Sequence, residues 1–306
     1  MLDKIQEFML SEVADMHGMP SGAYNIRANG ELAGRNSTAN VEIVSKTDLP
    51  GIDIKVKSGT KNESIHIPVV VSESGIKESV YNDFFIGDDC DVTIVAGCGI
   101  HNCGEHDSEH DGIHRFYIGK NSKMVYVEKH YGDGDGSGKR ILNPVTEVYM
   151  EEGSHVEMEM VQIKGVDSTN RVSRAKLAEG AKFIVRERLL THGDQFAESN
   201  YVVDLDGDGS SVDLISRSVA RDNSRQTFIS KINGNAKCSG HSECDAIIMD
   251  NAKIDAVPGL TANNIDAALI HEAAIGKIAG EQIIKLMTLG LTEEEAEAQI
   301  INGFLK

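Results

Sequence analysis

Apolar and polar residues alternate with a period of two along most of the chain, from residue 21 to residue 262. Short runs of this kind, such as Val41–Val44 and Ile52–Val56, are separated by glycine, aspartate and asparagine. Alternation over four to eight residues, bounded by turn-forming residues, is typical of half-buried strands. Residues 80–260 contain no amphipathic helical pattern of normal length. The pattern therefore predicts an all-β core over residues 21–262.

The strand runs form a loose repeat, in which an apolar pair and a turn precede an alternating strand. The turn glycines Gly87, Gly119, Gly153, Gly180 and Gly209 are spaced by 32, 34, 27 and 29 residues. A unit of two or three short strands cannot bury its apolar face alone, so successive units must stack. We interpret the repeat as a β-solenoid, also called a β-helix. The alternative is a large β-sandwich with many hairpins.

The N-terminal end has helical spacing instead. Between Leu2 and Met16 the apolar residues recur every three or four positions, which predicts a short helix within residues 1–20.

The C-terminal end, residues 263–306, is also predicted to be helical. Small and apolar residues at helical spacing indicate a first helix over Ala267–Met287, and Gly290 suits the cap that ends it. Thr292 and Glu295 form a capping box, which indicates the start of a final helix. A helix pair or a small bundle is therefore expected to close the chain.

Composition and charge exclude several classes of function. The 306 residues include 30 basic and 48 acidic side chains, a formal net charge of −18. Binding to a nucleic-acid backbone needs a cationic face, so a nucleic-acid partner is not expected. The chain has no run of about 18 apolar residues, and its first residues lack the pattern of a secretion signal. We expect a cytoplasmic protein with no membrane contact.

The cysteines mark the candidate chemistry. Five of them, Cys90, Cys98, Cys103, Cys238 and Cys244, form an odd set. In a chain without a secretion signal, this favours free thiols or metal and cluster ligation over a disulfide framework.

The segment from Cys98 to His114 is dense in sulfur and imidazole ligands, although Cys98-x4-Cys103 is not the spacing of a zinc knuckle. His106, His110 and His114 fall four residues apart, which would place them on one face of a helix, and a solvated loop is the other interpretation. This segment leaves a zinc site open.

Two motifs resemble ligand-binding loops but lack essential residues. Gly132–Lys139 has the glycines of a phosphate loop, but Asp133 and Arg140 stand where that motif requires glycine and Ser or Thr. We interpret it as an acidic flexible loop. The segment that begins at Asp204 starts like a calcium loop but has Ile215 at the twelfth position, where a glutamate is needed.

The last third of the chain carries a resemblance to a known family. Its motifs are, in order, Cys244-Asp245, Pro258, His271-Glu272-Ala273, Gly276-Lys277-Ile278, Glu281-Gln282, Gly290-Leu291 and Gly303-Phe304. In order, spacing and residue type this string resembles the SufB/SufD family of iron–sulfur cluster scaffold proteins. The resemblance implies a right-handed parallel β-helix flanked by helical regions, in agreement with the solenoid that the turn glycines indicate.

The resemblance also implies roles for individual residues. Cys244 matches the cysteine that receives sulfur and ligates the nascent cluster, and His271 and Glu272 match the adjacent polar pair. Gly97-Cys98 resembles the family's other sulfur-accepting cysteine. Gln282, Gly303 and Phe304 match the helical region, residues 263–306, that docks a SufC-like ABC ATPase.

The chain departs from the family pattern in its extra cysteines, Cys103 and Cys238, and in its histidine-rich insert. It resembles short SufB-like proteins that pair with one SufC-like ATPase, which implies a homodimer and a 2:2 complex.

The functional hypothesis is a scaffold that builds a cluster and transfers it to apo iron–sulfur proteins. Its predicted ligands are Cys244 and Glu272, joined by Cys98 or Cys103, with His271 as a further ligand or proton carrier. A [4Fe-4S] cluster is expected, with [2Fe-2S] as the alternative. No catalysis by the chain itself is expected, because ATP hydrolysis would come from the partner. The competing interpretations are a β-solenoid adaptor and a zinc-binding protein that uses residues 98–114.

Overall fold

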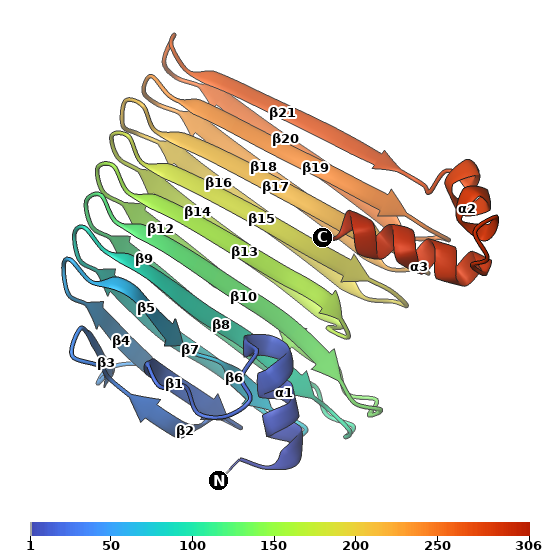
Figure 1. The fold of residues 1–306 in the computed structure, drawn as a ribbon, viewed down its shortest axis with the longest axis horizontal. Coiled ribbons are helices and arrows are strands. Elements are labelled where there is room, and N and C mark those ends of the chain that lie inside the picture. The colour runs from blue at the N-terminus through green and yellow to red at the C-terminus, as the bar shows by residue number, and fades with distance from the viewer. Residues whose placement is uncertain (1) are drawn as a thin grey trace.

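The structure is a computed structural model that describes residues 2–306, and in it two sheets face each other along a β-solenoid of about eight turns. From β7 onward the chain alternates between the two sheets from one turn to the next, and strands of successive turns pair in parallel (Figure 1). Only the pairs β1–β2 and β3–β4 are antiparallel. The predicted solenoid is confirmed, and the sandwich of hairpins is not observed.

The first sheet has eleven strands and the second has ten. The strands of the first sheet are β1 (Ala23–Ala28), β2 (Glu31–Asn36), β5 (Lys61–His66), β6 (Val69–Val71), β8 (Asp91–His101), β10 (Lys123–Asp133), β13 (His155–Lys164), β15 (Lys182–Thr191), β17 (Ser211–Ala220), β19 (Ser239–Ile248) and β21 (Ala268–Gly276). The strands of the second sheet are β3 (Val41–Ser45), β4 (Gly51–Val56), β7 (Lys77–Ile86), β9 (Ser108–Ile118), β11 (Arg140–Leu142), β12 (Val145–Met150), β14 (Ser168–Leu177), β16 (Phe196–Leu205), β18 (Arg225–Gly234) and β20 (Lys253–Ala262).

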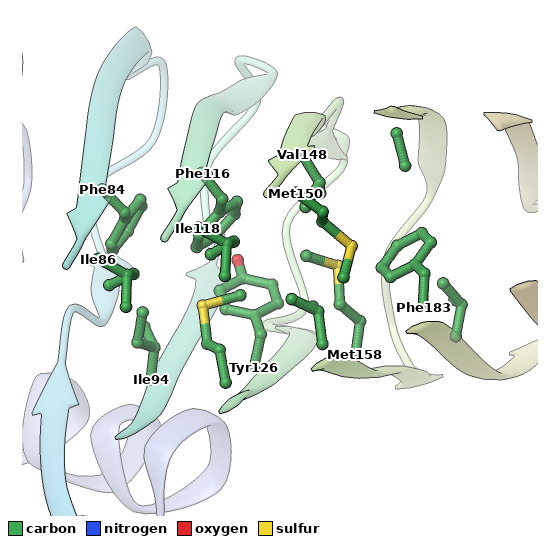
Figure 2. Packing of buried hydrophobic residues seen from close by; sticks show 14 of the residues in the cluster. Phe84, Ile86, Ile94, Phe116, Ile118, Tyr126, Val148, Met150, Met158 and Phe183 are labelled. Atoms are coloured by element: carbon green, nitrogen blue, oxygen red, sulfur yellow. The ribbon is translucent and has the colours of Figure 1, made fainter. Parts of the chain in front are cut away.

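The core lies between the sheets, where inward-facing residues of successive turns stack in rows. Phe84 and Phe116 occupy paired positions on β7 and β9, and their rings stack with centroids 4.4 Å apart (Figure 2). Tyr126 of β10 meets the second ring edge-on from the opposite sheet. Because paired residues of a parallel sheet face the same side, the alternating pattern of each strand adds one layer to these rows.

One row of corners has a left-handed backbone at the same place in successive turns. The residues with positive φ there are Asp89, Asn121, Gly153, Gly180 and Gly209. Asparagine and aspartate tolerate this conformation better than other residues with a side chain, and glycine adopts it without steric cost.

Gly87 and Gly119, which the sequence pattern aligned with these turn residues, lie two positions earlier and serve another purpose. A Cβ on Gly87 would lie 2.5 Å from the backbone nitrogen of Ser58 in the preceding turn, so glycine is needed there for close approach.

Helix α1 (Lys4–Ala14) begins at a capping box formed by Asp3 and Gln6 and packs on the outer face of the first sheet. Gly97 and Gly99 of β8 lie under it, and a Cβ at either would collide with Val13 or Met9. The glycines on both sides of Cys98 thus let the helix approach the sheet. The predicted N-terminal helix is confirmed.

The C-terminal helices are α2 (Gly280–Met287) and α3 (Glu293–Phe304), and Thr292 and Glu295 form the predicted capping box. The prediction of a helix from Ala267 onward is wrong for its first part, because Ala268–Gly276 form strand β21. The solenoid therefore continues past residue 262 before the helices begin. Strands β20 and β21 end the two sheets, each with an unpaired edge.

Candidate functional site

A polar line runs through the interior of the solenoid between two buried cysteines. Strand register places Ala96, Glu128, Met160, Glu187, Ser216 and Cys244 in one inward-facing row of the first sheet. Cys98 lies in the neighbouring inward row, after Val69 and before His130 and Gln162. Buried polar groups of this kind persist only when other groups satisfy them.

The first part of the line surrounds Cys98, which is 7% exposed. His110 of β9 contacts its sulfur, and the Nδ1 atom of His110 lies 3.0 Å from a carboxylate oxygen of Glu78. Arg27 donates to the other oxygen of Glu78 at 2.8 Å. Burial by itself lowers the pKa of His110, but the Cys98 sulfur and the Glu78 carboxylate outweigh it and raise that pKa to about 10. A cation therefore lies beside Cys98.

The next part of the line is a chain of hydrogen bonds across the two sheets. Tyr126 donates to Glu128 at 2.9 Å and accepts from Nδ1 of His114 at 2.8 Å. Asn82 donates to the other ring nitrogen of His114 at 3.2 Å. Burial lowers the pKa of His114 to about 4, so the ring is neutral at neutral pH, with the one donor and one acceptor that this chain needs.

A buried ion pair occupies the middle of the line. Arg171 of β14 donates to Glu128 from the opposite sheet, and both side chains are almost fully buried. Burial opposes ionisation of Glu128, but the guanidinium of Arg171 overrides it and lowers the pKa of Glu128 to about 2. His130 lies 3.6 Å from the same carboxylate, but burial lowers its pKa to about 4, so this contact is not an ion pair at neutral pH.

The last part of the line leads to Cys244. The buried carboxylate of Glu187 accepts hydrogen bonds from Ser199, from Tyr201 at 3.1 Å and from Ser216 at 2.8 Å. Ser216 is the register neighbour of Cys244. Burial, together with the negative charges of Glu187 and Asp245, raises the pKa of the Cys244 thiol to about 12. In this structure Cys244 is thus a neutral thiol, in contrast to the cationic surroundings of Cys98.

The two cysteines are far apart within one chain. Five strand spacings separate β8 from β19 in the first sheet, which corresponds to about 24 Å. The space beside Arg171 and Glu187 amounts to about 10 Å³, enough for roughly one water molecule. The structure therefore does not bring Cys98 and Cys244 together, and no open channel joins them through this part of the line.

The predicted partners of Cys244 lie on the terminal strand β21. Register pairs His271 with Ser242, which faces inward, and pairs Glu272 with Glu243 on the outer face. His271 and Cys244 therefore share the inner face of neighbouring strands, whereas Glu272 points to the other side. Within residues 2–306, no group of three His, Cys, Asp or Glu side chains is arranged to hold a metal ion. One chain alone does not complete the predicted ligand set.

The histidine-rich segment is neither a helix nor a solvated loop over most of its length. His110 and His114 are buried on strand β9, and only His106 lies in an exposed loop. Both buried rings are engaged with protein groups, and they do not converge with His106 on a zinc site. Cys90 and Cys238 are buried among core residues.

Cys103 lies outside the interior line. It is exposed, and its sulfur lies 3.1 Å from Nε2 of His101.

The predicted docking residues belong to the C-terminal helices. Gln282 of α2 and Gly303 of α3 are exposed, and Phe304 is half-buried. Exposed apolar side chains lie beside them on α2 and after it, among them Ile284, 62% exposed, and Leu289, 76% exposed. Across residues 2–306, none of the helices combines the length and apolar character that a membrane crossing requires.

The buried charges Glu128, Arg171 and Glu187 escaped the sequence reasoning. The sequence pattern that could have revealed them is a charged residue at a position where an alternating strand faces inward, such as Glu128 between Tyr126 and His130. That signal identifies a site only when the inward face is known, because a strand has two faces.

Comparisons with known proteins agree with this architecture. The family model described as "SUF system FeS cluster assembly, SufBD core domain" matches residues 91–304. An iron–sulfur cluster assembly SufBD family protein of Methanocaldococcus jannaschii is 29% identical, over 82% of this chain and 79% of its own length. A protein of that description from Methanothermobacter thermautotrophicus is 26% identical, over 84% of this chain and 63% of its own length. One from Pyrococcus horikoshii is 26% identical, over 99% of this chain and 95% of its own length.

Proposed function

Because this chain belongs to the SufBD family of iron–sulfur cluster assembly proteins, we propose that it is a scaffold on which a cluster is built at Cys244 and then transferred to apo-proteins. Family membership supports a role in cluster assembly. The observation that supports Cys244 is its position, facing inward one strand from the unpaired end of the solenoid. A thiol there is shielded from solvent in the single chain and becomes accessible when the last strand moves.

The nascent cluster is the cargo, and its ligand set would combine thiolate, imidazole and carboxylate. Cys244 and His271 share the inner face, and Glu272 stands next to His271 on the outer face. A mixed set of this kind releases a cluster more readily than four thiolates do. A [4Fe-4S] cargo is our first choice and [2Fe-2S] the alternative. Because three or four ligands are needed and one chain does not gather them, the set must be completed from outside the chain.

A second copy of the chain is the proposed source of the missing ligands. Strands β20 and β21 leave exposed backbone edges and exposed apolar side chains, including Val257, Ile270 and Ile275. An exposed edge strand is a template for pairing with another chain. Two copies that meet at these edges would bring two Cys244 thiols and two His271–Glu272 pairs together. This supports the homodimer that the sequence suggested.

The C-terminal helices are the proposed docking surface for a SufC-like ABC ATPase. Exposed apolar side chains on and after α2, together with Gln282 and Gly303, form a surface that the solenoid does not cover. Hydrolysis by the ATPase would then open the paired edges and expose Cys244. Addition of this chain to such an ATPase should raise its hydrolysis rate, and Ile284→Asp should abolish the effect.

Anaerobic reconstitution tests the scaffold. The wild type, supplied with iron and sulfide, should develop a broad visible absorption and contain iron and acid-labile sulfide. Cys244→Ser should abolish both and Glu272→Ala should reduce them, whereas Cys238→Ala removes another buried cysteine and should leave them intact. Full absorbance in the Cys244 variant would refute the assignment, and wild-type protein without iron or sulfide would favour the adaptor.

A further inference from the structure

An exposed cysteine, a histidine and an aspartate form a hydrogen-bonded series on the surface of the solenoid. Strands β8 and β10 are neighbours (Figure 1), and His101 and Asp133 end them. The two residues are register partners, so their side chains share one face. Nδ1 of His101 bonds a carboxylate oxygen of Asp133, and Nε2 lies 3.1 Å from the sulfur of Cys103. Cys103 follows His101 by two residues, in the loop that begins where β8 ends.

The hydrogen bonds determine which nitrogen can accept the thiol proton. A carboxylate only accepts, so Nδ1 of His101 carries the hydrogen that it donates to Asp133. In the neutral ring Nε2 is then an acceptor, and it faces the sulfur of Cys103. This is the order of groups by which an oriented imidazole generates a nucleophile: the thiol transfers its proton to Nε2, and the carboxylate stabilises the imidazolium.

The carboxylate itself is held from behind. The hydroxyl of Tyr131 donates to Asp133 at 3.3 Å, and Lys164 donates to that hydroxyl at 3.0 Å. The ring of Tyr131 also packs edge-on against Phe8 of α1, with centroids 6.2 Å apart. Asp133 is therefore oriented by a neighbouring strand and by the N-terminal helix.

The loop that carries Cys103 is fixed in place by the glycine-rich segment that the sequence suggested was flexible. The backbone of Asn102 bonds Asp133 and Gly136, at 3.0 and 3.1 Å, and its side chain bonds the backbone of Gly104 at 3.0 Å. A Cβ on Gly136 would overlap the backbone of residues 103 and 104, so glycine permits the contact. The alternating glycines of residues 132–138 thus buttress the Cys103 loop, which keeps the thiol near His101.

Accessibility separates Cys103 from the other cysteines. Cys90, Cys98, Cys238 and Cys244 are all buried, so Cys103 is the one exposed thiol that the described residues offer. Transfer between two proteins requires the sulfur atoms to touch, and in this structure a macromolecular donor reaches only Cys103.

We propose that Cys103 is the nucleophile that accepts sulfane sulfur from a protein persulfide, with His101 as its base and Asp133 as the residue that positions the imidazole. This inference rests on the proposed scaffold function and names the entry point for its sulfur. His101 takes the Cys103 proton, and the thiolate attacks the outer sulfur of the donor persulfide. A bond forms between that sulfur and Cys103 while the donor's sulfur–sulfur bond breaks. The donor leaves as a thiolate and takes the proton from His101, so Cys103 becomes a persulfide without net oxidation or reduction.

Sulfur uptake from glutathione persulfide tests the assignment directly. Peptide mass spectrometry after brief exposure of the full-length protein should find one added sulfur atom, first at Cys103. His101→Ala should slow this uptake about 100-fold or more, the usual contribution of a general base, and added imidazole should restore part of the rate. Asp133→Asn should slow uptake, and Asp133→Glu should recover part of the loss. The matched control is His155→Ala, since His155 lies 3.1 Å from Glu157 on the same sheet without a cysteine, and it should leave uptake unchanged.

The result that overturns the proposal is uptake at Cys103 that is unaffected by His101→Ala, or uptake that begins at another cysteine. A second experiment separates this inference from the scaffold function. Cys103→Ser should assemble a cluster normally from iron and inorganic sulfide, but acquire no sulfur atom during brief exposure to glutathione persulfide without a reductant. Normal sulfur uptake by this variant would refute the role of Cys103 while leaving the scaffold intact. Failure of the wild type to assemble a cluster from iron and inorganic sulfide would refute the scaffold.

Discussion

Removal of the buried cation Arg171 should cost the solenoid about 3 kcal/mol, and the cost should depend on pH. Arg171 lowers the pKa of Glu128 from 4.5 to about 2, and about 2.5 pKa units correspond to about 3 kcal/mol. Loss of one partner of a buried ion pair costs a similar amount, about 3–5 kcal/mol. In Arg171→Met the carboxylate of Glu128 would remain buried without its cation.

The direction of the pH dependence follows from the pKa of Glu128. In the wild type the folded-state pKa is lowered, so the stabilisation is present above about pH 4.5 and is lost as the pH falls through about 2. In Arg171→Met burial should raise that pKa above 4.5, so the folded state binds a proton more tightly than the unfolded state. The free energy of unfolding of the variant should therefore fall further below that of the wild type at pH 8 than at pH 5.

Urea denaturation followed by circular dichroism, at pH 5 and pH 8, measures both effects. Glu128→Gln combined with Arg171→Met provides the control, because it removes the stranded charge. The double variant should be more stable than the single variant at pH 8, and its deficit should not change with pH. A single variant that loses less than about 1 kcal/mol, or loses the same amount at both pH values, would refute the reasoning.

Three further predictions concern the other contacts that build the solenoid. Glu78→Gln should destabilise the fold at pH 7 by about 3 kcal/mol. The wild type should lose stability between pH 6.5 and about 10, where the raised pKa of His110 contributes, and the variant should lose less over that range. Thermal melts measure this, and the same change of melting temperature with pH in both proteins would show that the pairing is unimportant. Gly97→Ala should displace α1 and speed proteolysis at the N-terminus, whereas Gly276→Ala meets open space and should not; equal cleavage of both variants would contradict the close approach. Gly180→Val should lower the free energy of unfolding by about 1–2 kcal/mol because φ is +64° there, and Gly180→Asn should lower it less. Urea denaturation midpoints measure the difference, and equal midpoints for the two variants would argue against the left-handed corner.

The solenoid could be predicted because its physical rule is local and repeated. Alternation fixes the faces of each strand, and a turn length near 30 residues fixes which strands become neighbours. The terminal strand β21 escaped the prediction because Ala268–Gly276 are rich in alanine and apolar on both faces, which favours a helix locally. Pairing with β19 along the whole strand overrides that preference. Such pairing is a tertiary effect that a single segment does not encode.

The candidate sites were predictable in part, for a related reason. Residues four apart share a face of a strand as well as of a helix, so the spacing of His110 and His114 could not distinguish the two. The contact between His101 and Asp133 was present in the sequence as a separation of 32 residues, which is one turn of the solenoid. It became visible only with the register, because a shift of one residue would have turned Asp133 to the other face.

The electrostatics of the interior give its two ends different chemistry. Near Cys98 the raised pKa of His110 places a cation beside the sulfur. Near Cys244 burial, together with the negative charges of Glu187 and Asp245, does the opposite and keeps the thiol protonated, with a pKa of about 12. The scaffold function that we propose would bring iron to this thiol, and an arriving iron ion would have to displace the thiol proton as it binds. On that proposal, iron binding at Cys244 should release a proton and should weaken as the pH falls.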